Sequence, residues 1–377
     1  MLLCSQAVAF SVGFIAPHTL KSEEGLHRKQ RNPEDLMNVT EMIRYHGYPS
    51  EEYEVNTEDG YILGVFRIPS GRNMQNTGQK PVVLLHHGTF ADCSYWISNL
   101  PNNSLGFILA DAGYDVWLGN SRGNTLSAKH KTLKTCQKEF WQFSFDEIGK
   151  YDLPAELYFI MNKTGQKNVY YVGHSEGSTV GFVAFSTYPE LAQRVKMFFA
   201  LGPVLTITHA TSPFTTFARL PQPVIKLLLG CKGALRQNEL LRRLAIPLCS
   251  SLQKACANIL YSIAGGRAQN LNAVSMSRNA LMQVEQNFWY NSIHSGALPF
   301  LQSIPPEYKI EKISTPIAVW SGGQDKFADP KDTAKLLSRI NNLYYHENFP
   351  FWGHLDFVWG LDAAEKMYQK IVELMRK

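Results

Sequence analysis

The sequence predicts an α/β fold with a mostly parallel central sheet, helices on both of its faces and a helical cap insertion. Three observations support this prediction: strand and helix patterns alternate along most of the chain, several strand segments are unbroken apolar runs, and strand patterns disappear between Pro203 and Pro305. Alternating strands and helices are typical of a parallel sheet. Strands covered on both faces read as continuous apolar runs.

The composition is that of a folded chain with a sizeable core. Of 377 residues, 45% are hydrophobic, 12% aromatic and 18% charged, which excludes disordered and coiled-coil proteins because both carry more charge. The 37 basic and 32 acidic residues give a net charge of +5, without the basic patch that a nucleic-acid partner requires. The six Cys and eleven His lack zinc-type spacing. We expect no metal and no other cofactor.

The first 20 residues carry no Lys, Arg, Asp or Glu and are mostly apolar as far as Ala16. A membrane span needs about 20 strongly apolar residues, whereas this run is shorter and ends at Pro17. We therefore interpret residues 1–20 as a signal peptide, with no transmembrane anchor and a secreted or lysosomal destination. Three Asn-X-Ser/Thr sequons give modest support and are candidate glycosylation sites: Asn38, Asn102 and Asn162.

The predicted α/β core has two parts, residues 32–202 and 306–377, separated by a cap at 203–305. The cap is rich in Leu, Pro and small residues. Apolar periodicity and turn residues define the elements of both parts. In the core we expect strands at 61–68, 81–86, 114–118, 168–172, 197–201, 316–320 and 343–346 and helices at 105–112, 154–161 and 178–185; in the cap we expect helical segments at 224–229 and 257–264.

The chain closes with a predicted amphipathic helix that we expect to cover one face of the sheet. Its apolar residues recur with the 3.6-residue helical period. These residues are Ala364, Met367, Tyr368, Ile371, Val372 and Met375.

A Gly-x-Ser-x-Gly pentapeptide, Gly173 to Gly177, lies between an apolar strand and a helical segment. A nucleophile elbow has this context, and its sharp turn needs small residues around the serine so that the hydroxyl stands clear. The pentapeptide alone is expected by chance in about one chain in ten of this length. Its position between strand and helix therefore carries the prediction that Ser175 is a nucleophile.

The acid that orients the base follows the serine in chain order in this fold. Asp325 comes just after the strand at 316–320, at the end of the sheet where open α/β sheets bind ligands. Asp329 and Asp332 are nearby alternatives, but Pro330 and the helical pattern after it indicate capping roles. We predict Asp325 as the acid.

His354 is the predicted general base, because it lies in the loop between the last strand and the terminal helix. A histidine taken singly is more often structural or solvated, and only its position favours a catalytic role. His174 neighbours the serine and His346 lies within a strand. We interpret both as structural.

The strand at 81–86 leads into Gly88, Thr89 and Phe90, where an esterase of this fold places the loop that donates one oxyanion-hole amide. The second amide belongs to the residue after the nucleophile. The predicted donors are the backbone N–H groups of Thr89 and Glu176. A tight turn without function is the alternative for this loop, but together with the serine, acid and base it indicates acyl transfer.

Several longer segments resemble the acid lipase family of α/β-hydrolases, which includes gastric lipase and lysosomal acid lipase. The resemblance covers nearly the whole chain after the signal peptide. It is carried by Asn-Val-Thr-Glu-Met-Ile at 38–43, Gly-Asn-Ser-Arg-Gly-Asn-Thr at 119–125, Trp-Ser-Gly-Gly-Gln-Asp at 320–325, and further segments at 48–53, 57–63, 102–113, 151–155 and 354–363.

The resemblance implies that Ser175, Asp325 and His354 form a catalytic triad. It also implies hydrolysis of neutral lipid esters, triacylglycerols or cholesteryl esters, at acidic pH and at a lipid–water interface. The family's cap disulfide corresponds to Cys249 and Cys256. The chain carries Glu176 where the family usually has Gln, and Thr89-Phe90 where it has Leu-Leu. A carboxylate at Glu176 would repel the oxyanion, so one hypothesis is that Glu176→Gln raises turnover, more at neutral than at acidic pH. The alternative is an exposed Glu176 near a helix N-terminus, where its charge is favourable and has no effect on turnover.

Two other functions compete with that of a lipase. One is a catalytically weak or inactive paralogue that binds lipid in the apolar cap groove, and the other is an esterase for small soluble esters. A complete triad favours an enzyme over a binding protein.

Overall fold

The computed structural model describes residues 33–72, 78–89, 91–213, 215, 253–270 and 307–377. The chain divides into two compact units, residues 1–35 and 36–377. Of the first unit only residues 33–35 are described, and they belong to the 3₁₀ turn η1 (Pro33–Leu36). The predicted signal peptide lies outside the described residues.

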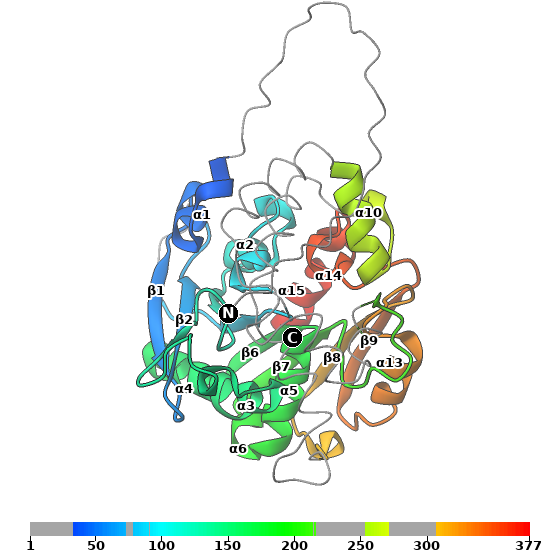
Figure 1. The fold of residues 1–377 in the computed structure, drawn as a ribbon. Coiled ribbons are helices and arrows are strands. Elements are labelled where there is room, and N and C mark those ends of the chain that lie inside the picture. The colour runs from blue at the N-terminus through cyan, green and yellow to red at the C-terminus, as the bar shows by residue number, and fades with distance from the viewer. Residues whose placement is uncertain (1–32, 73–77, 90, 214, 216–252, 271–306) are drawn as a thin grey trace, which may run out of the picture. The chain divides into compact units, whose positions relative to one another are not determined.

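The second unit is built on one sheet with the strand order β1-β2-β4-β3-β6-β7-β8-β9, and β5 pairs with β2 (Figure 1). The pairs β1–β2, β2–β4 and β2–β5 are antiparallel, and the pairs from β4 to β9 are parallel. The predicted mostly parallel sheet is confirmed. The strands are β1 (Glu51–Asn56), β2 (Tyr61–Ile68), β3 (Val82–His86), β4 (Asp115–Gly119), β5 (Lys129–His130), β6 (Val169–His174), β7 (Val195–Leu201), β8 (Ile317–Gly322) and β9 (Leu343–Phe349).

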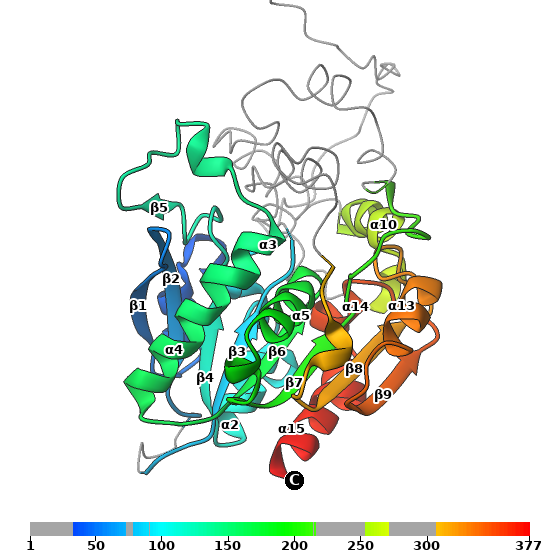
Figure 2. The ribbon, with the colours of Figure 1, turned by 90° about the horizontal axis from the view of Figure 1, so that it is seen from below.

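Helices flank the sheet on both sides: α4 and α5 lie on one side and α2 and α15 on the other (Figure 2). The α-helices are α1 (Val39–Tyr45), α2 (Leu105–Asp111), α3 (Phe145–Glu147), α4 (Leu153–Thr164), α5 (Glu176–Thr187), α6 (Pro189–Ala192), α10 (Gln253–Ala264), α13 (Pro330–Leu337), α14 (Asp356–Trp359) and α15 (Gln369–Arg376). The described chain also contains the π-helical turns η5 (Ile148–Asp152) and η9 (Ala364–Tyr368). Its further 3₁₀ turns are η2 (Cys93–Trp96), η3 (Pro101–Asn103), η4 (Glu139–Trp141), η6 (Ala268–Asn270) and η8 (Ile310–Lys312).

Each central strand contributes to two hydrophobic cores, because successive side chains point to opposite faces. In β3, Val83 and Leu85 join the cluster that contains residues of α1, α2 and α15. Val82 and Leu84 join the cluster built on α4 and α5. This two-sided burial explains the continuous apolar runs in the sequence.

The predicted core strands and helices are all present, with ends displaced by a few residues. The terminal helix begins as the π turn η9 and continues as α15, and it buries Met367, Ile371 and Met375 as expected. The sequence analysis missed β1 and the short β5. In β1, at a sheet edge, the exposed Glu52, Glu54 and Asn56 alternate with residues that are half-buried or buried, so the continuous apolar run that marks the inner strands is absent.

Most of the predicted cap lies outside the described residues, including the helical segment at 224–229. The segment at 257–264 falls within α10. The end of α10 contacts the loops that follow β8 and β9, since Gly265 forms a bridge with Asp325 and the backbone N–H of His354 donates to the carbonyl of Ala264 at 3.0 Å.

The cysteines are only partly described. Cys249 and the side chain of Cys256 lie outside the described part, so their pairing stays a prediction. Cys93 is buried and free, and Cys136 is exposed and free. No helix within the described ranges is long and apolar enough to cross a bilayer.

Candidate active site

Three side chains predicted from the sequence meet at the carboxyl ends of β6, β8 and β9. The Ser175 Oγ lies 2.6 Å from the His354 Nε2, and the His354 Nδ1 lies 2.8 Å from the Asp325 Oδ2. All three residues are buried, with exposed fractions of 8%, 6% and 3% for serine, histidine and aspartate. The ring nitrogens therefore have a fixed assignment: Nδ1 donates to the carboxylate and Nε2 accepts from the serine hydroxyl.

Ser175 occupies the turn between β6 and α5 with φ 55° and ψ −117°. Among the described residues it is the one non-glycine with positive φ, which is the strained backbone of a nucleophile elbow. Its N–H is held by the Leu201 carbonyl at 2.9 Å. A Cβ on Gly173 would lie 2.5 Å from the carbonyl of Gly177, so the turn tolerates no side chain there.

Asp325 is held so that one oxygen remains available to the base. Its Oδ1 accepts the backbone N–H groups of Phe327 and Ala328, each at 2.8 Å. This leaves the Oδ2 for His354.

The two alternative aspartates bond elsewhere. Asp329 caps α13 by accepting the N–H of Lys331, as predicted. Asp332 instead accepts the N–H of His209 at 2.8 Å and contacts its ring. The capping interpretation of Asp332 was therefore wrong, because its carboxylate faces His209.

His174 forms two hydrogen bonds at this site that were not predicted from the sequence. Its Nε2 donates to the carbonyl oxygen of His354 at 2.9 Å, and its Nδ1 lies 3.1 Å from the hydroxyl of Tyr95. Burial lowers the pKa of His174 well below its usual value, so the ring is neutral. The Tyr95 hydroxyl also accepts the N–H of Gly88 at 3.1 Å. His346 lies apart from this group and contacts Ser321 at 3.0 Å.

The loop after β3 lies directly against the nucleophile, because a Cβ on Gly88 would come within 2.8 Å of the Ser175 Cβ. The Ser121 N–H donates to the His87 Nε2 at 3.1 Å, which leaves the proton on Nδ1. That nitrogen donates to the Gly88 carbonyl at 2.8 Å. Since carbonyl and N–H point in opposite directions across a trans peptide, this bond orients the Thr89 N–H.

The backbone N–H groups of Thr89 and Glu176 have no acceptor among the described residues. They flank Ser175, as donors to a developing oxyanion would. Their side chains also meet: the Thr89 Oγ1 donates to the Glu176 Oε2 at 3.0 Å. Burial raises the pKa of Glu176 to about 8. The alternative of an exposed Glu176 is wrong, because the residue is 8% exposed.

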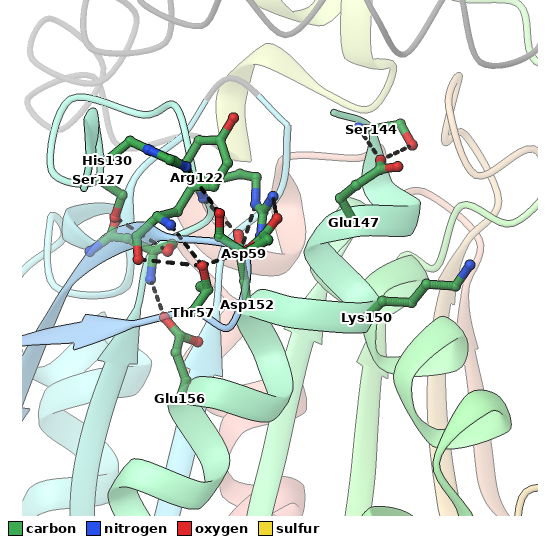
Figure 3. Close-up of polar contacts among 12 residues, drawn as sticks. Thr57, Asp59, Arg122, Ser127, His130, Ser144, Glu147, Lys150, Asp152 and Glu156 are labelled. Carbon is green, nitrogen blue, oxygen red and sulfur yellow. Dashed lines mark hydrogen bonds and ion pairs between the residues drawn. The ribbon is translucent and has the colours of Figure 1, made fainter. Parts of the chain in front are cut away.

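A buried charged network around Arg122 fixes the chain segment after β4 (Figure 3). The same segment contains Ser121, whose N–H donates to His87. The Arg122 guanidinium bonds Asp152 at 2.8 Å and Asp59 at 2.9 Å. It also lies 4.0 Å from the ring centroid of Tyr61. The Arg122 side chain is 1% exposed, so both carboxylates compensate a desolvated cation.

A second buried pair, His86 and Glu156, joins the end of β3 to α4. The Glu156 Oε1 accepts the N–H of Asn120 at 2.9 Å, and its Oε2 is 3.7 Å from the His86 Nε2. Burial lowers the pKa of His86 to about 3 and raises the pKa of Glu156. Burial therefore favours the uncharged form of each group.

Two family models match the chain. A partial α/β-hydrolase lipase region matches residues 39–100, and the α/β-hydrolase fold matches residues 81–361.

Curated relatives share about half of the sequence. Lysosomal acid lipase/cholesteryl ester hydrolase from Homo sapiens is 51% identical over 92% of this chain and 92% of its own. Lipase member M from Mus musculus is 50% identical over 93% of this chain and 89% of its own. Gastric triacylglycerol lipase from Mus musculus is 47% identical over 92% of this chain and 93% of its own.

Solved structures with the same fold are more distant in sequence. An α/β-hydrolase fold protein from Nakamurella multipartita aligns with a TM-score of 0.55 at 14% identity, over 86% of this chain and 99% of that one. The carboxylesterase CesB from Bacillus subtilis aligns with a TM-score of 0.53 at 14% identity, over 89% and 95%. These likenesses show the fold alone.

Proposed function

Because the chain belongs to the α/β-hydrolase lipase family that includes lysosomal acid lipase and gastric lipase, we propose that it is a serine-dependent hydrolase of neutral lipid esters. The observation that carries the proposal is the continuous hydrogen-bonded array from Ser175 through His354 to Asp325. Such an array activates a serine hydroxyl for attack on an acyl carbon.

In the proposed reaction the Ser175 oxygen attacks the ester carbonyl carbon while the His354 Nε2 takes the hydroxyl proton. The carbonyl oxygen becomes an oxyanion, which the N–H groups of Thr89 and Glu176 stabilise. Collapse breaks the bond to the alcohol oxygen, which receives the proton from His354 and leaves. Water, deprotonated by the same nitrogen, then attacks the acyl-enzyme. The bond between the acyl carbon and the Ser175 oxygen breaks, the serine oxygen takes the proton back from His354, and the carboxylic acid is released.

The proposed substrates are triacylglycerols and cholesteryl esters, since relatives of this chain are named for those two activities. We propose that they are met at a lipid–water interface and at acidic pH, in a secreted or lysosomal setting. The predicted division into a core at 32–202 and 306–377 and a cap at 203–305 belongs to the same proposal. The three sequon asparagines, Asn38, Asn102 and Asn162, are exposed, which supports glycosylation in the secretory pathway.

A serine-directed phosphonate tests the proposal at the level of chemistry. The purified protein should be labelled at Ser175 in a peptide mass map, because labelling requires an activated nucleophile, whereas a lipid-binding pocket alone gives none. Ser175→Ala is the control for labelling elsewhere. A folded parent protein that resists labelling would favour the lipid-binding paralogue.

A second assay separates a lipase from an esterase of small soluble esters. The rate with one ester is measured below and above its solubility limit. A lipase should gain activity once droplets form, because its substrate is presented at an interface. A rate that levels off at the solubility limit would support the esterase.

A further inference from the structure

The residues whose backbone N–H groups flank Ser175 are also joined through their side chains. We propose, on the basis of the function proposed above, that the hydrogen bond between Thr89 and Glu176 is a bridge across the oxyanion hole. In this bridge the Glu176 side chain is a positioning residue that acts in its protonated, uncharged form.

The bridge connects two segments that are 87 residues apart in sequence. Glu176 opens α5 and is fixed by the elbow, whereas Thr89 lies on a loop that is held on its other side through Gly88. Within the described part of the chain, the Thr89 hydroxyl has no other hydrogen-bond partner than the Glu176 carboxyl. This contact is therefore the side-chain hydrogen bond that joins the two residues directly, and it adds to the bonds at Gly88 in fixing the separation of the two N–H groups.

The residue Glu176 is 8% exposed, and no Lys, Arg or His among the described residues forms an ion pair with its carboxyl. Ionisable side chains of the adjoining segments include His174 on β6, His87 on the loop after β3, and the His354–Asp325 pair. Burial lowers the pKa values of His174 and His87, which disfavours their charged forms, and Asp325 is bound to His354.

The charge state of Glu176 determines how the bridge affects turnover. The pKa of Glu176 is raised to about 8 by burial, so below that pH a neutral carboxyl accepts from Thr89 next to the oxyanion hole. Above it, a carboxylate lies close to the position where the negative oxygen forms. Like charges at close range in a poorly solvated site repel strongly, so turnover should decline as Glu176 ionises.

Four variants separate the bridge from a merely structural contact. Thr89→Val removes the hydroxyl at constant shape, and Glu176→Leu removes the acceptor. Thr89→Ser and Glu176→Gln restore a hydroxyl and an uncharged acceptor. The matched control is Thr315→Val, which loses a buried hydroxyl bonded to the Ala192 carbonyl at the opposite end of β8.

The readouts are kcat and KM for a soluble ester between about pH 5 and about pH 9, with thermal unfolding of each variant. We expect Thr89→Val and Glu176→Leu to lower kcat about tenfold or more, with little change in KM, as expected when a contact made in the transition state is weakened. The Ser and Gln variants should recover most of that loss. Glu176→Gln should also lack the alkaline decline of the parent, and Thr315→Val should keep the parental kcat and pH profile.

The outcomes distinguish the bridge from the function on which it rests. If the parent is active and is labelled at Ser175, but Thr89→Val and Glu176→Leu match its kcat, the bridge is overturned and the enzyme stands. The same holds if Glu176→Gln keeps the parental alkaline decline. If the parent neither hydrolyses the ester nor reacts with the phosphonate, the proposed function fails and the bridge fails with it.

Discussion

The His174 Nε2 donates to the carbonyl oxygen of His354 at 2.9 Å, so the residue before Ser175 supports the loop that carries His354. Tyr95 extends this support, since its hydroxyl contacts the His174 Nδ1 and accepts the N–H of Gly88. The loop that contains Gly88 and the loop that contains His354 are thus connected through the side chains of Tyr95 and His174.

Tyr95→Phe should disturb both ends of that connection. It leaves the Gly88 N–H and the His174 Nδ1 without their partner, and a buried unsatisfied group costs about 1–3 kcal/mol. We expect a loss of that size in the free energy of unfolding, measured by urea denaturation, together with a lower kcat. Tyr344→Phe, at a residue that is 54% exposed, is the control. Parental stability and kcat in Tyr95→Phe would show that the connection is dispensable.

The tight turn at Ser175 could be predicted from the sequence, whereas the hydrogen bonds that Tyr95 and His174 make around it could not. The turn at Ser175 demands small neighbours, and this demand leaves a local signature in Gly173 and Gly177. The Tyr95–His174 contact joins residues that are 79 positions apart, and a tyrosine in a loop carries no mark of its partner. The raised pKa of Glu176 could not be predicted from the sequence either, because it results from burial in the folded chain.

Glu176→Gln should alter how stability depends on pH. The unfolded carboxyl titrates near its ordinary value of 4.5 and the folded one near 8, so the folded state binds the proton more tightly. The contribution of the Glu176 carboxyl to the free energy of unfolding is largest below about pH 4.5. It falls by on the order of a few kcal/mol as the pH rises towards 8. The difference in unfolding free energy between variant and parent should grow over that interval. A constant difference would contradict a buried, uncharged carboxyl.

Arg122→Met should be strongly destabilising. It leaves the Asp152 carboxyl, which is fully buried, without its cation, and breaking a buried pair in this way costs about 3–5 kcal/mol. The double variant Arg122→Met/Asp152→Asn removes the orphaned charge and should recover part of the loss in a urea unfolding experiment. No recovery in the double variant would mean that packing of the arginine on Tyr61, rather than charge compensation, stabilises this region.

Each Asn→Gln variant, expressed in a glycosylating cell, should have a molecular mass lower than that of the parent by one glycan. Asn38→Gln should have an additional effect, because the Asn38 side chain caps α1 by accepting the N–H of Glu41 at 2.9 Å. Loss of such a cap costs about 1 kcal/mol, whereas Asn102→Gln and Asn162→Gln should leave the unfolding of the deglycosylated protein unchanged. Variants that migrate like the parent would rule out glycosylation at those positions.

A mutant cycle on kcat measures whether Ser175, His354 and Asp325 act as one catalytic unit. Ser175→Ala, His354→Ala and the double variant are compared at one pH, with circular dichroism to verify the fold. We expect losses of up to about 10⁶ in each single variant, and no further loss in the double variant, because either change alone disables the unit. Losses that multiply, or a Ser175→Ala protein that keeps most of its activity, would show that these residues do not form a catalytic triad.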